Sequence, residues 1–325
     1  MSPVTTVTVR VPAKVNLQLA VGPVRADGYH DVATVYHAVS LFDEVTVAAA
    51  ERDNVAIVGE GADMVPVDSS NLAARAAGTL PRVVGFGLQD APGLAIQITK
   101  RIPVAAGLAG GSADAAATLV ACNELWGTGL SQQELCELAS GIGSDVAFGL
   151  LGGTAIGMGR GEQVTSVLTS GTFHWVLAFA NDGLSTADVY AACDRMRASQ
   201  EGGKAKERKV GTTGVPDPVL DTALIAALRS GDPAELGSLL SNDLQSAAIS
   251  LRPALRRTLA AGRELGALGA MVSGSGPTCA FLAKNRRHAR DLAAALAGAG
   301  VCRTVAQVTG PAPGATIMGT PTERA

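Results

Sequence analysis

The sequence predicts an α+β protein built from two domains. Its 325 residues are enough for two substantial hydrophobic cores. Strand patterns dominate the opening segment, and helical patterns come in groups instead of alternating regularly with strands. The sequence shows no internal repeat. We therefore expect two α+β domains that meet near residues 160–170, and not a regular βαβ array.

The first element is a long strand with alternating apolar side chains, which places one face on a core. The apolar positions are Val7, Val9, Val11, Ala13, Val15, Leu17, Leu19 and Val21. Lys14 and Asn16 lie on the opposite face, where period-two geometry puts them side by side. They can line one site together, and a solvated outer face is the alternative. A turn at Asp27-Gly28 then leads into further strand material over 32–47.

The next feature is a glycine-rich turn that runs straight into an alanine-rich helix, over residues 102–117. A strand at 94–101 precedes it. Ser112 is expected to cap the helix, which ends near Trp126, before Gly127. Glycines admit positive φ, and the free N–H groups of a first helical turn attract anions, so this pattern is typical of a phosphate site.

Two common phosphate loops do not match this stretch. A P-loop needs a lysine after its glycines, and none follows here. The glycine order at 107, 110 and 111 also differs from the dinucleotide-binding fingerprint. The alternative to a phosphate site is a helix start whose glycines only allow close packing.

The other elements are expected from periodicity and turn signals. Helices are predicted at 71–80, 132–140, 217–230, 233–240, 253–265 and 287–296. Strand or loop is expected at 152–161, a strand at 173–180, and a strand–turn–strand unit at 271–282. Residues 198–215 are predicted to be an exposed, mobile insert, and 311–325 a disordered tail.

Composition excludes several classes of function. A net charge of −3 offers no basic surface for nucleic acid. No charge-free apolar run reaches the roughly 18 residues of a membrane span, and the N-terminus lacks the pattern of a signal peptide. Five scattered cysteines indicate reduced thiols rather than disulfides or a zinc site. We expect a cytoplasmic protein without nucleic-acid or membrane partners. Separately, we expect a monomer or weak homodimer.

Three further segments carry candidate chemistry. Asp145 follows a glycine-containing turn, so it could cap a helix or accept a proton from a substrate hydroxyl. Tyr29-His30 stands out because aromatic residues make up only 3% of the chain. The pair could hold a nucleobase by stacking and edge contact, or it could simply pack a loop. Residues 273–278 form a second glycine turn with hydroxyl side chains, which is a weak signal alone.

These segments together resemble the GHMP kinase superfamily, which includes galactokinase, homoserine kinase and mevalonate kinase. Its three motifs match in order at 12–17, 103–117 and 273–278. Segments 27–30, 71–72 and 143–146 resemble the branch that acts on a cytidine diphosphate-linked methylerythritol. The resemblance extends over roughly residues 7–310.

The resemblance implies a fold and an activity. The fold is an N-terminal ribosomal-S5-like, ATP-binding domain over 1–165 and a C-terminal ferredoxin-like, substrate-side domain over 166–310. The activity is ATP-dependent phosphorylation of a tertiary 2-hydroxyl, in the non-mevalonate route to isoprenoid precursors. ATP would be the co-substrate and Mg²⁺ the metal, with ligands that the motifs do not identify.

The resemblance also implies roles for matching residues. Lys14 and Asp145 would be the catalytic pair, with Lys14 keeping Asp145 ionised. The substrate would contact Asn16, Tyr29 and His30, with Thr186 and Tyr190 as further candidates, and the third-motif loop would contribute Gly274, Ser275 and Gly276. ATP would be bound by Asn71, Pro103, Val104, Ala105, Ala106, Gly107, Leu108, Ala109, Gly110, Gly111, Ser112 and Ala113.

Two departures and two alternatives stand beside this reading. The insert at 198–215 lengthens the substrate half, and the motifs give no role for it. Ala147 occupies a position where the family often has proline, so a looser turn is expected after Asp145. Another kinase of the superfamily is the nearest alternative, but its substrates carry no base for Tyr29 and His30 to hold. A non-catalytic nucleotide-binding protein is the other, and the presence of both Lys14 and Asp145 argues against it.

Overall fold

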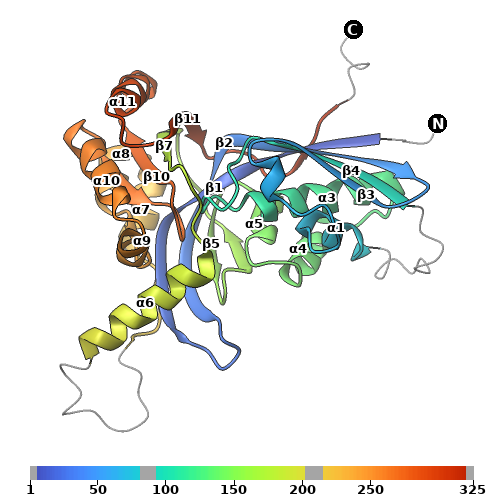
Figure 1. Ribbon diagram of the computed structural model, residues 1–325, viewed down its shortest axis with the longest axis horizontal. Coiled ribbons are helices and arrows are strands. Elements are labelled where there is room, and N and C mark those ends of the chain that lie inside the picture. The colour runs from blue at the N-terminus through green and yellow to red at the C-terminus, as the bar shows by residue number, and fades with distance from the viewer. Residues whose placement is uncertain (1–5, 81–92, 202–214, 320–325) are drawn as a thin grey trace.

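The computed structural model describes residues 6–80, 93–201 and 215–319, and within them the chain forms two β-sheets with helices packed beside each (Figure 1). The strands are β1 Thr6–Val24, β2 His30–Ala50, β3 Asn54–Gly59, β4 Gly93–Lys100, β5 Thr154–Met158, β6 Gln163–Ser166, β7 Phe173–Phe179, β8 Ser241–Asn242, β9 Gly269–Val272, β10 Cys279–Ala283, β11 Thr304–Gly310 and β12 Thr316–Ile317.

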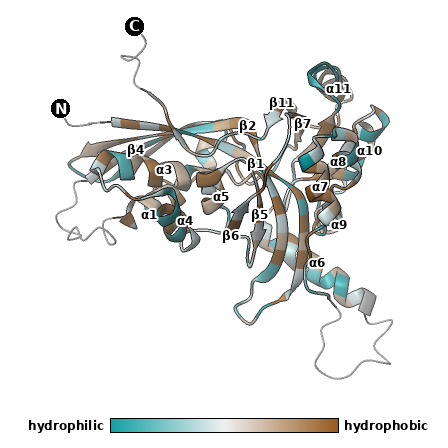
Figure 2. Ribbon diagram, turned by 180° about the vertical axis from the view of Figure 1, so that it is seen from behind, coloured by the Kyte–Doolittle hydropathy of each residue, from teal (hydrophilic) through white to brown (hydrophobic). Residues whose placement is uncertain are grey.

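Helices account for most of the remaining described residues. They are the 3₁₀ helix η1 Ala62–Met64 and the α-helices α1 Leu72–Ala77, α3 Gly110–Trp126, α4 Gln132–Ser140, α5 Val146–Leu151, α6 Thr186–Glu201, α7 Thr222–Ser230, α8 Pro233–Ser238, α9 Gln245–Leu251, α10 Ala254–Glu264 and α11 Arg286–Gly298. Hydrophobic residues dominate α3, whereas α10 and α11 carry many hydrophilic residues (Figure 2).

The first sheet is built on the long antiparallel pair β1 and β2. Its order is β12-β1-β2-β4-β3, with β5 and β6 attached to β2 and β8 attached to β1. Helix α3 packs against β1 and β2 and forms part of the same core. Register shifts after Pro12 and after Asn16 interrupt the β1–β2 ladder, so the side chains that face each other depend on these bulges.

Both faces of β1 are buried from Val11 to Leu19, so the alternative of a solvated polar face is wrong. The C-terminal half reaches the second face, because the Gln18 side chain donates a hydrogen bond to the carbonyl of Val219. Burial of a polar strand face requires partners for its polar groups. Lys14 and Asn16 therefore lie inside the molecule.

The second sheet begins with β7 and has the order β11-β7-β10-β9. The change of sheet falls between Ser166 and Phe173, but β8 and β12 return to the first sheet from the later part of the chain. The largest core also contains side chains of both halves, including Leu17 and Trp175. The division into domains at 165/166 stays a prediction.

The strand–turn–strand unit at 271–282 is confirmed as β9 and β10, but other expectations need correction. Residues 311–319 are not a disordered tail, because β12 pairs with β1 and the N–H of Gly153 donates to the carbonyl of Ala312. Backbone pairing of this kind involves no side-chain pattern that a sequence would reveal. Of the expected insert, 198–201 belong to α6, and 202–214 lie outside the described residues.

Membrane and redox expectations can be compared with the same regions. In the three described ranges, no helix combines the length and apolar character needed to cross a bilayer. All five cysteines are free thiols. Burial raises the pKa of Cys122 and of Cys279 to about 12, so both stay protonated and unreactive.

Candidate active site

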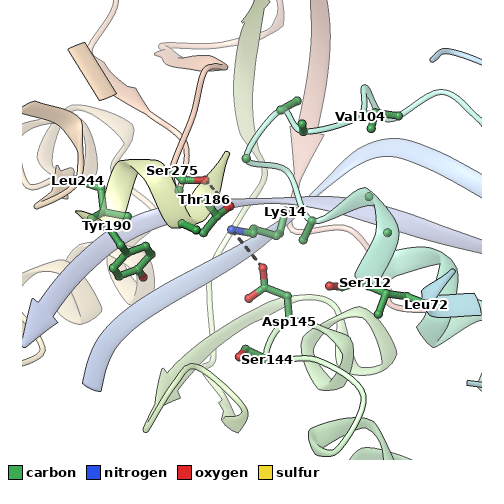
Figure 3. A pocket seen from close by; sticks show the side chains of 18 of the residues that line it. Lys14, Leu72, Val104, Ser112, Ser144, Asp145, Thr186, Tyr190, Leu244 and Ser275 are labelled. Atoms are coloured by element: carbon green, nitrogen blue, oxygen red, sulfur yellow. Dashed lines mark hydrogen bonds and ion pairs between the residues drawn. The ribbon is translucent and has the colours of Figure 1, made fainter. Parts of the chain in front are cut away.

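A cavity of about 820 Å³ lies where the two halves meet, and it brings together most of the residues predicted from sequence (Figure 3). The predicted residues that line it are Lys14, Asn16, Tyr29, His30, Asn71, Pro103, Val104, Ala105, Ala106, Gly107, Ala109, Gly110, Gly111, Ser112, Asp145, Thr186, Tyr190, Gly274 and Ser275. Leu108 and Ala113 point into the core instead, and Gly276 is not among the lining residues. The volume is within the range of small-molecule sites.

The glycine-rich loop enters α3 earlier than expected. The helix starts at Gly110, not after Ser112, because Ala109 adopts the left-handed conformation (φ 58°) and no side chain caps the helix. Among the described residues with a side chain, Ala105 and Ala109 alone have positive φ. Left-handed backbone costs an alanine about 1–2 kcal/mol, and such strain is concentrated at functional sites. The uncapped first N–H groups of α3 are available to an anion.

Contacts to two distant segments hold the loop in place. The N–H of Lys14 donates to the carbonyl of Leu108 over 3.2 Å. The Ser273 hydroxyl donates to the carbonyl of Gly107 over 3.2 Å. A Cβ at Gly107 would overlap the Ser273 carbonyl oxygen and lie 2.8 Å from the nitrogen of Gly276. The first, second and third motifs thus meet at this loop.

Lys14 and Asp145 approach each other across the cavity. Lys14 Nζ lies 3.6 Å from Asp145 Oδ2, and the two side chains are 8% and 26% exposed. Lys14 Nζ also donates to Asn16 Oδ1 over 2.6 Å, while Asn16 Nδ2 donates to Thr34 Oγ1 over 2.8 Å. The ammonium group is therefore held in one orientation, next to a carboxylate that a ligand can still reach.

Asp145 occupies the N-cap position of α5, but its side chain makes no capping hydrogen bond. The capping alternative is therefore wrong for the side chain. Oδ1 instead accepts a hydrogen bond of 2.8 Å from the Tyr36 hydroxyl. Burial, reinforced by the negative charge of Asp145, raises the pKa of Tyr36 well above its usual value, so the phenol keeps its proton. Ala147, the departure from the family pattern, is buried in the first turn of α5.

A buried ionic cluster beneath the loop was missed by sequence reasoning. Lys100 Nζ donates to Asp43 Oδ2 over 2.5 Å and to Asp114 Oδ2 over 2.6 Å. Asp43 Oδ1 also accepts the N–H groups of Arg101 and Ile102. Burial, together with the charge of Asp43, raises the pKa of Asp114 to about 7. The cluster connects β2, β4 and α3, and an acidic residue on an apolar strand was the only sequence signal for it.

Aromatic side chains gather at the other end of the cavity. His30 is buried, its ring centroid lies 4.9 Å from that of Tyr190, and its Nε2 lies 3.0 Å from Asp194 Oδ1. Tyr29 is 55% exposed, and the Arg160 guanidinium carbon lies 5.1 Å from its ring centroid. An exposed ring such as that of Tyr29 can stack on a flat ligand. Sequence reasoning found the rings, but not Arg160 or Asp194.

Three further predicted residues line the walls of the cavity. The hydroxyl groups of Thr186 on α6 and Ser275 lie 2.9 Å apart, which joins α6 to the third-motif turn (Figure 3). Asn71 caps α1 by accepting the N–H of Ala73, and its Nδ2 donates to the carbonyl of Pro66. The Asn71 side chain therefore also orders the segment before α1.

Known proteins are similar to this chain in both sequence and architecture. The model of the GHMP kinases N terminal domain matches residues 71–153, and that of the GHMP kinases C terminal matches 224–302. A 4-diphosphocytidyl-2-C-methyl-D-erythritol kinase of Mycolicibacterium gilvum is 56% identical over 319 residues, covering 98% of this chain and 95% of its own. The corresponding kinase of Thermobifida fusca is 54% identical over 326 residues, covering 98% of this chain and 100% of its own.

Solved structures show the same similarity. The crystal structure of a 4-(cytidine 5'-diphospho)-2C-methyl-D-erythritol kinase superposes with a TM-score of 0.71 at 31% identity, covering 96% of this chain and 100% of its own. A homoserine kinase from Cytophaga hutchinsonii gives a TM-score of 0.72 at 18% identity, covering 98% and 99%, and shares the fold alone. With its three motifs gathered around one cavity and these relatives along nearly its whole length, the chain belongs to the GHMP kinase family.

Proposed function

We propose that this protein transfers the γ-phosphoryl group of ATP to the tertiary 2-hydroxyl of 4-diphosphocytidyl-2-C-methyl-D-erythritol, in the route to isoprenoid precursors. The observation that carries the proposal is the cavity itself. It has a phosphate-type loop at one end, aromatic rings at the other, and the Lys14–Asp145 pair along its wall. Relatives at 54–56% identity are named for this activity.

The two ends of the cavity suit different ligands. The loop and the first turn of α3 present backbone N–H groups to the phosphates of ATP. Tyr29, His30 and Tyr190 offer faces and edges for a cytosine ring. Homoserine and mevalonate contain no such ring, so this end favours the cytidine-bearing substrate.

The transfer needs one proton acceptor and one positive charge. The oxygen of the substrate hydroxyl bonds to the γ-phosphorus, and the bond from that phosphorus to the β-γ bridging oxygen breaks, which releases ADP. The Asp145 carboxylate accepts the proton that the hydroxyl loses. Lys14 stabilises the ionised carboxylate and faces the phosphoryl group, where negative charge is spread over oxygens. A tertiary alcohol is hindered, so positioning by the rigid cavity supplies much of the acceleration.

Magnesium fits the proposed site through oxygen donors. The Ser112 hydroxyl lines the cavity at the first turn of α3, and hard oxygen ligands suit Mg²⁺. In the regions that the structure describes, no group of three or more His, Cys, Asp or Glu could hold a metal ion. We therefore expect phosphate oxygens and water to provide most ligands. Bound there, the ion would neutralise charge on the β- and γ-phosphates.

The cellular setting is part of the same proposal. Free, buried thiols such as Cys122 and Cys279 suit a reducing compartment, so we place the enzyme in the cytoplasm. We expect a monomer or a weak homodimer.

The test is an ADP-release assay with purified protein and ATP. We expect turnover with the diphosphocytidyl substrate and none with homoserine or mevalonate. Asp145→Asn should lower kcat by at least about a hundredfold while ATP binding changes little, because only the proton acceptor is lost. Asp232→Asn is the matched control, since Asp232 also precedes a six-residue helix, α8, and lies outside the cavity. Turnover of homoserine alone, or an active Asp145→Asn variant, contradicts the proposal.

A further inference from the structure

Tyr36 lies outside the three sequence motifs, and its side chain directly contacts the proposed proton acceptor, Asp145. Tyr36 lies on β2, paired with Asn16 of β1. It is 3% exposed, and its ring stacks on Phe148 of α5 with centroids 4.9 Å apart. All three tyrosines of the chain line the cavity, but Tyr36 alone has a hydroxyl bonded to Asp145.

The surroundings are shaped to admit this side chain. A Cβ at Gly157 would overlap the Tyr36 ring and lie 2.9 Å from the Thr34 methyl carbon, and a Cβ at Gly161 would overlap the Tyr36 hydroxyl. Both glycines lie in the β5–β6 hairpin or its turn. The hydroxyl also lies 3.4 Å from the carbonyl oxygen of Gly161, a contact too long to compete with the 2.8 Å bond to Asp145. The ring and its hydroxyl therefore have one available placement.

The two oxygens of Asp145 have different neighbours. Tyr36 donates to Oδ1, and Lys14 lies 3.6 Å from Oδ2. The Lys14 ammonium is also 5.6 Å from the centroid of the Tyr36 ring. With Oδ1 bonded to the Tyr36 hydroxyl, Oδ2 is the oxygen left to accept a proton from a ligand in the cavity that Asp145 lines.

We propose that Tyr36 is a positioning residue of the phosphoryl transfer, which fixes the rotation of the Asp145 carboxylate so that Oδ2 faces the substrate hydroxyl. The inference rests on the function proposed above. Tyr36 keeps its own proton throughout, and the proton of the substrate hydroxyl ends on Oδ2. A carboxylate held by the Oδ1 bond does not need to reorient when the reaction starts.

The direct test is Tyr36→Phe, which keeps the ring and removes only the hydroxyl. We expect kcat to fall about tenfold or more, because the carboxylate loses its fixed rotation. KM for ATP and for the diphosphocytidyl substrate should stay within about twofold, because the hydroxyl contacts neither ligand in the proposed arrangement. Thr258→Val is the matched control, since it removes another buried hydroxyl bond, the 2.6 Å contact to the carbonyl of Val301, in a helix outside the cavity.

A double-variant cycle separates positioning from general destabilisation. In the Asp145→Asn background, Tyr36→Phe should cause no further loss of the residual kcat, because its effect passes through the carboxylate. A second full loss in that background overturns the proposal, as does a Tyr36→Phe enzyme with kcat within twofold of the parent. If the unchanged protein does not phosphorylate the substrate at all, the proposed function fails first and separately.

A second variant reaches the same hydroxyl from the other side. Gly161→Ala introduces a Cβ against the Tyr36 oxygen, so it should reduce kcat even though the phenol remains. Gly171→Ala is its control, because Gly171 has a similarly positive φ and nothing within 4 Å of the added carbon. Equal kcat values in the two glycine variants would contradict the positioning role.

Discussion

The Gly107→Ala variant tests whether phosphoryl transfer from ATP requires contact between the glycine-rich loop and the third-motif turn. Gly107 has φ +76°, so alanine costs about 1–2 kcal/mol in backbone energy alone. The added Cβ also overlaps the Ser273 carbonyl oxygen and approaches the nitrogen of Gly276 to 2.8 Å. Normal carbon contacts are near 3.5 Å, so loop and turn must separate by about 1 Å.

A shift of that size is enough to impair catalysis. Misplacement of reacting groups by about 1 Å can cost about a hundredfold in rate. We therefore expect kcat/KM for ATP to fall by about that factor. The hydrogen bond from the Ser273 hydroxyl to the Gly107 carbonyl should also be lost. Steady-state ADP release across a range of ATP concentrations measures it, and thermal denaturation checks that the variant folds.

Gly127→Ala is the matched control for the backbone term. Gly127 ends the same helix, α3, with φ +60°, and nothing lies within 4 Å of an added Cβ. Alanine at this position should destabilise the fold by about the same backbone term, without any clash. Its Tm should therefore fall, while its kcat/KM for ATP stays within about twofold of the parent. If both variants show the same ATP kinetics, the contact between the two loops is not needed.

Two more predictions concern buried ionisable groups. Burial raises the pKa of Asp114 to about 7 from a usual 3.8, so its carboxyl stabilises the folded chain below about pH 4 and that contribution is lost as pH rises to about 7. Between about pH 4 and 7, the unfolding free energy of Asp114→Asn should therefore rise relative to that of the parent. Urea titrations in which the difference between the two proteins does not change with pH would contradict this. Burial lowers the pKa of His37 to about 3, so its contribution is present above pH 6.5 and is lost as pH falls. His37→Gln should remove a slope of about 1.4 kcal/mol per pH unit between about pH 6 and 4, and an unchanged slope in the same titrations would refute this.

Much of the site could be predicted because its signals are local. The loop at 103–113 is recognisable from glycine spacing followed by helix-forming alanines, and both properties belong to adjacent residues. Tyr29 and His30 stand out in a chain with few aromatic residues. Lys14 and Asn16 share a strand face by simple alternation, which the structure keeps despite nearby bulges.

Other parts could not be predicted, because they depend on which distant segments meet. Tyr36 reaches Asp145 only because the β1–β2 register and its bulges set which side chains face the cavity. The Lys100–Asp43–Asp114 cluster joins three elements whose charges look unremarkable one by one. Helix α6 was also missed, since its polar composition carries little helical periodicity and its packing against α9 decides its place.

The sequence by itself determined the local chemistry: a strand with Lys14 on its polar face, a phosphate-type loop, and an acid after a tight turn at Asp145. Only the tertiary structure decided that Lys14 lies 3.6 Å from Asp145, that Tyr36 bonds the same carboxylate, and that the chain after Pro311 pairs with β1. The physical reason is the range of the interactions. Neighbouring residues determine backbone conformation and periodicity, whereas the burial and pairing of charges depend on how whole sheets and helices pack.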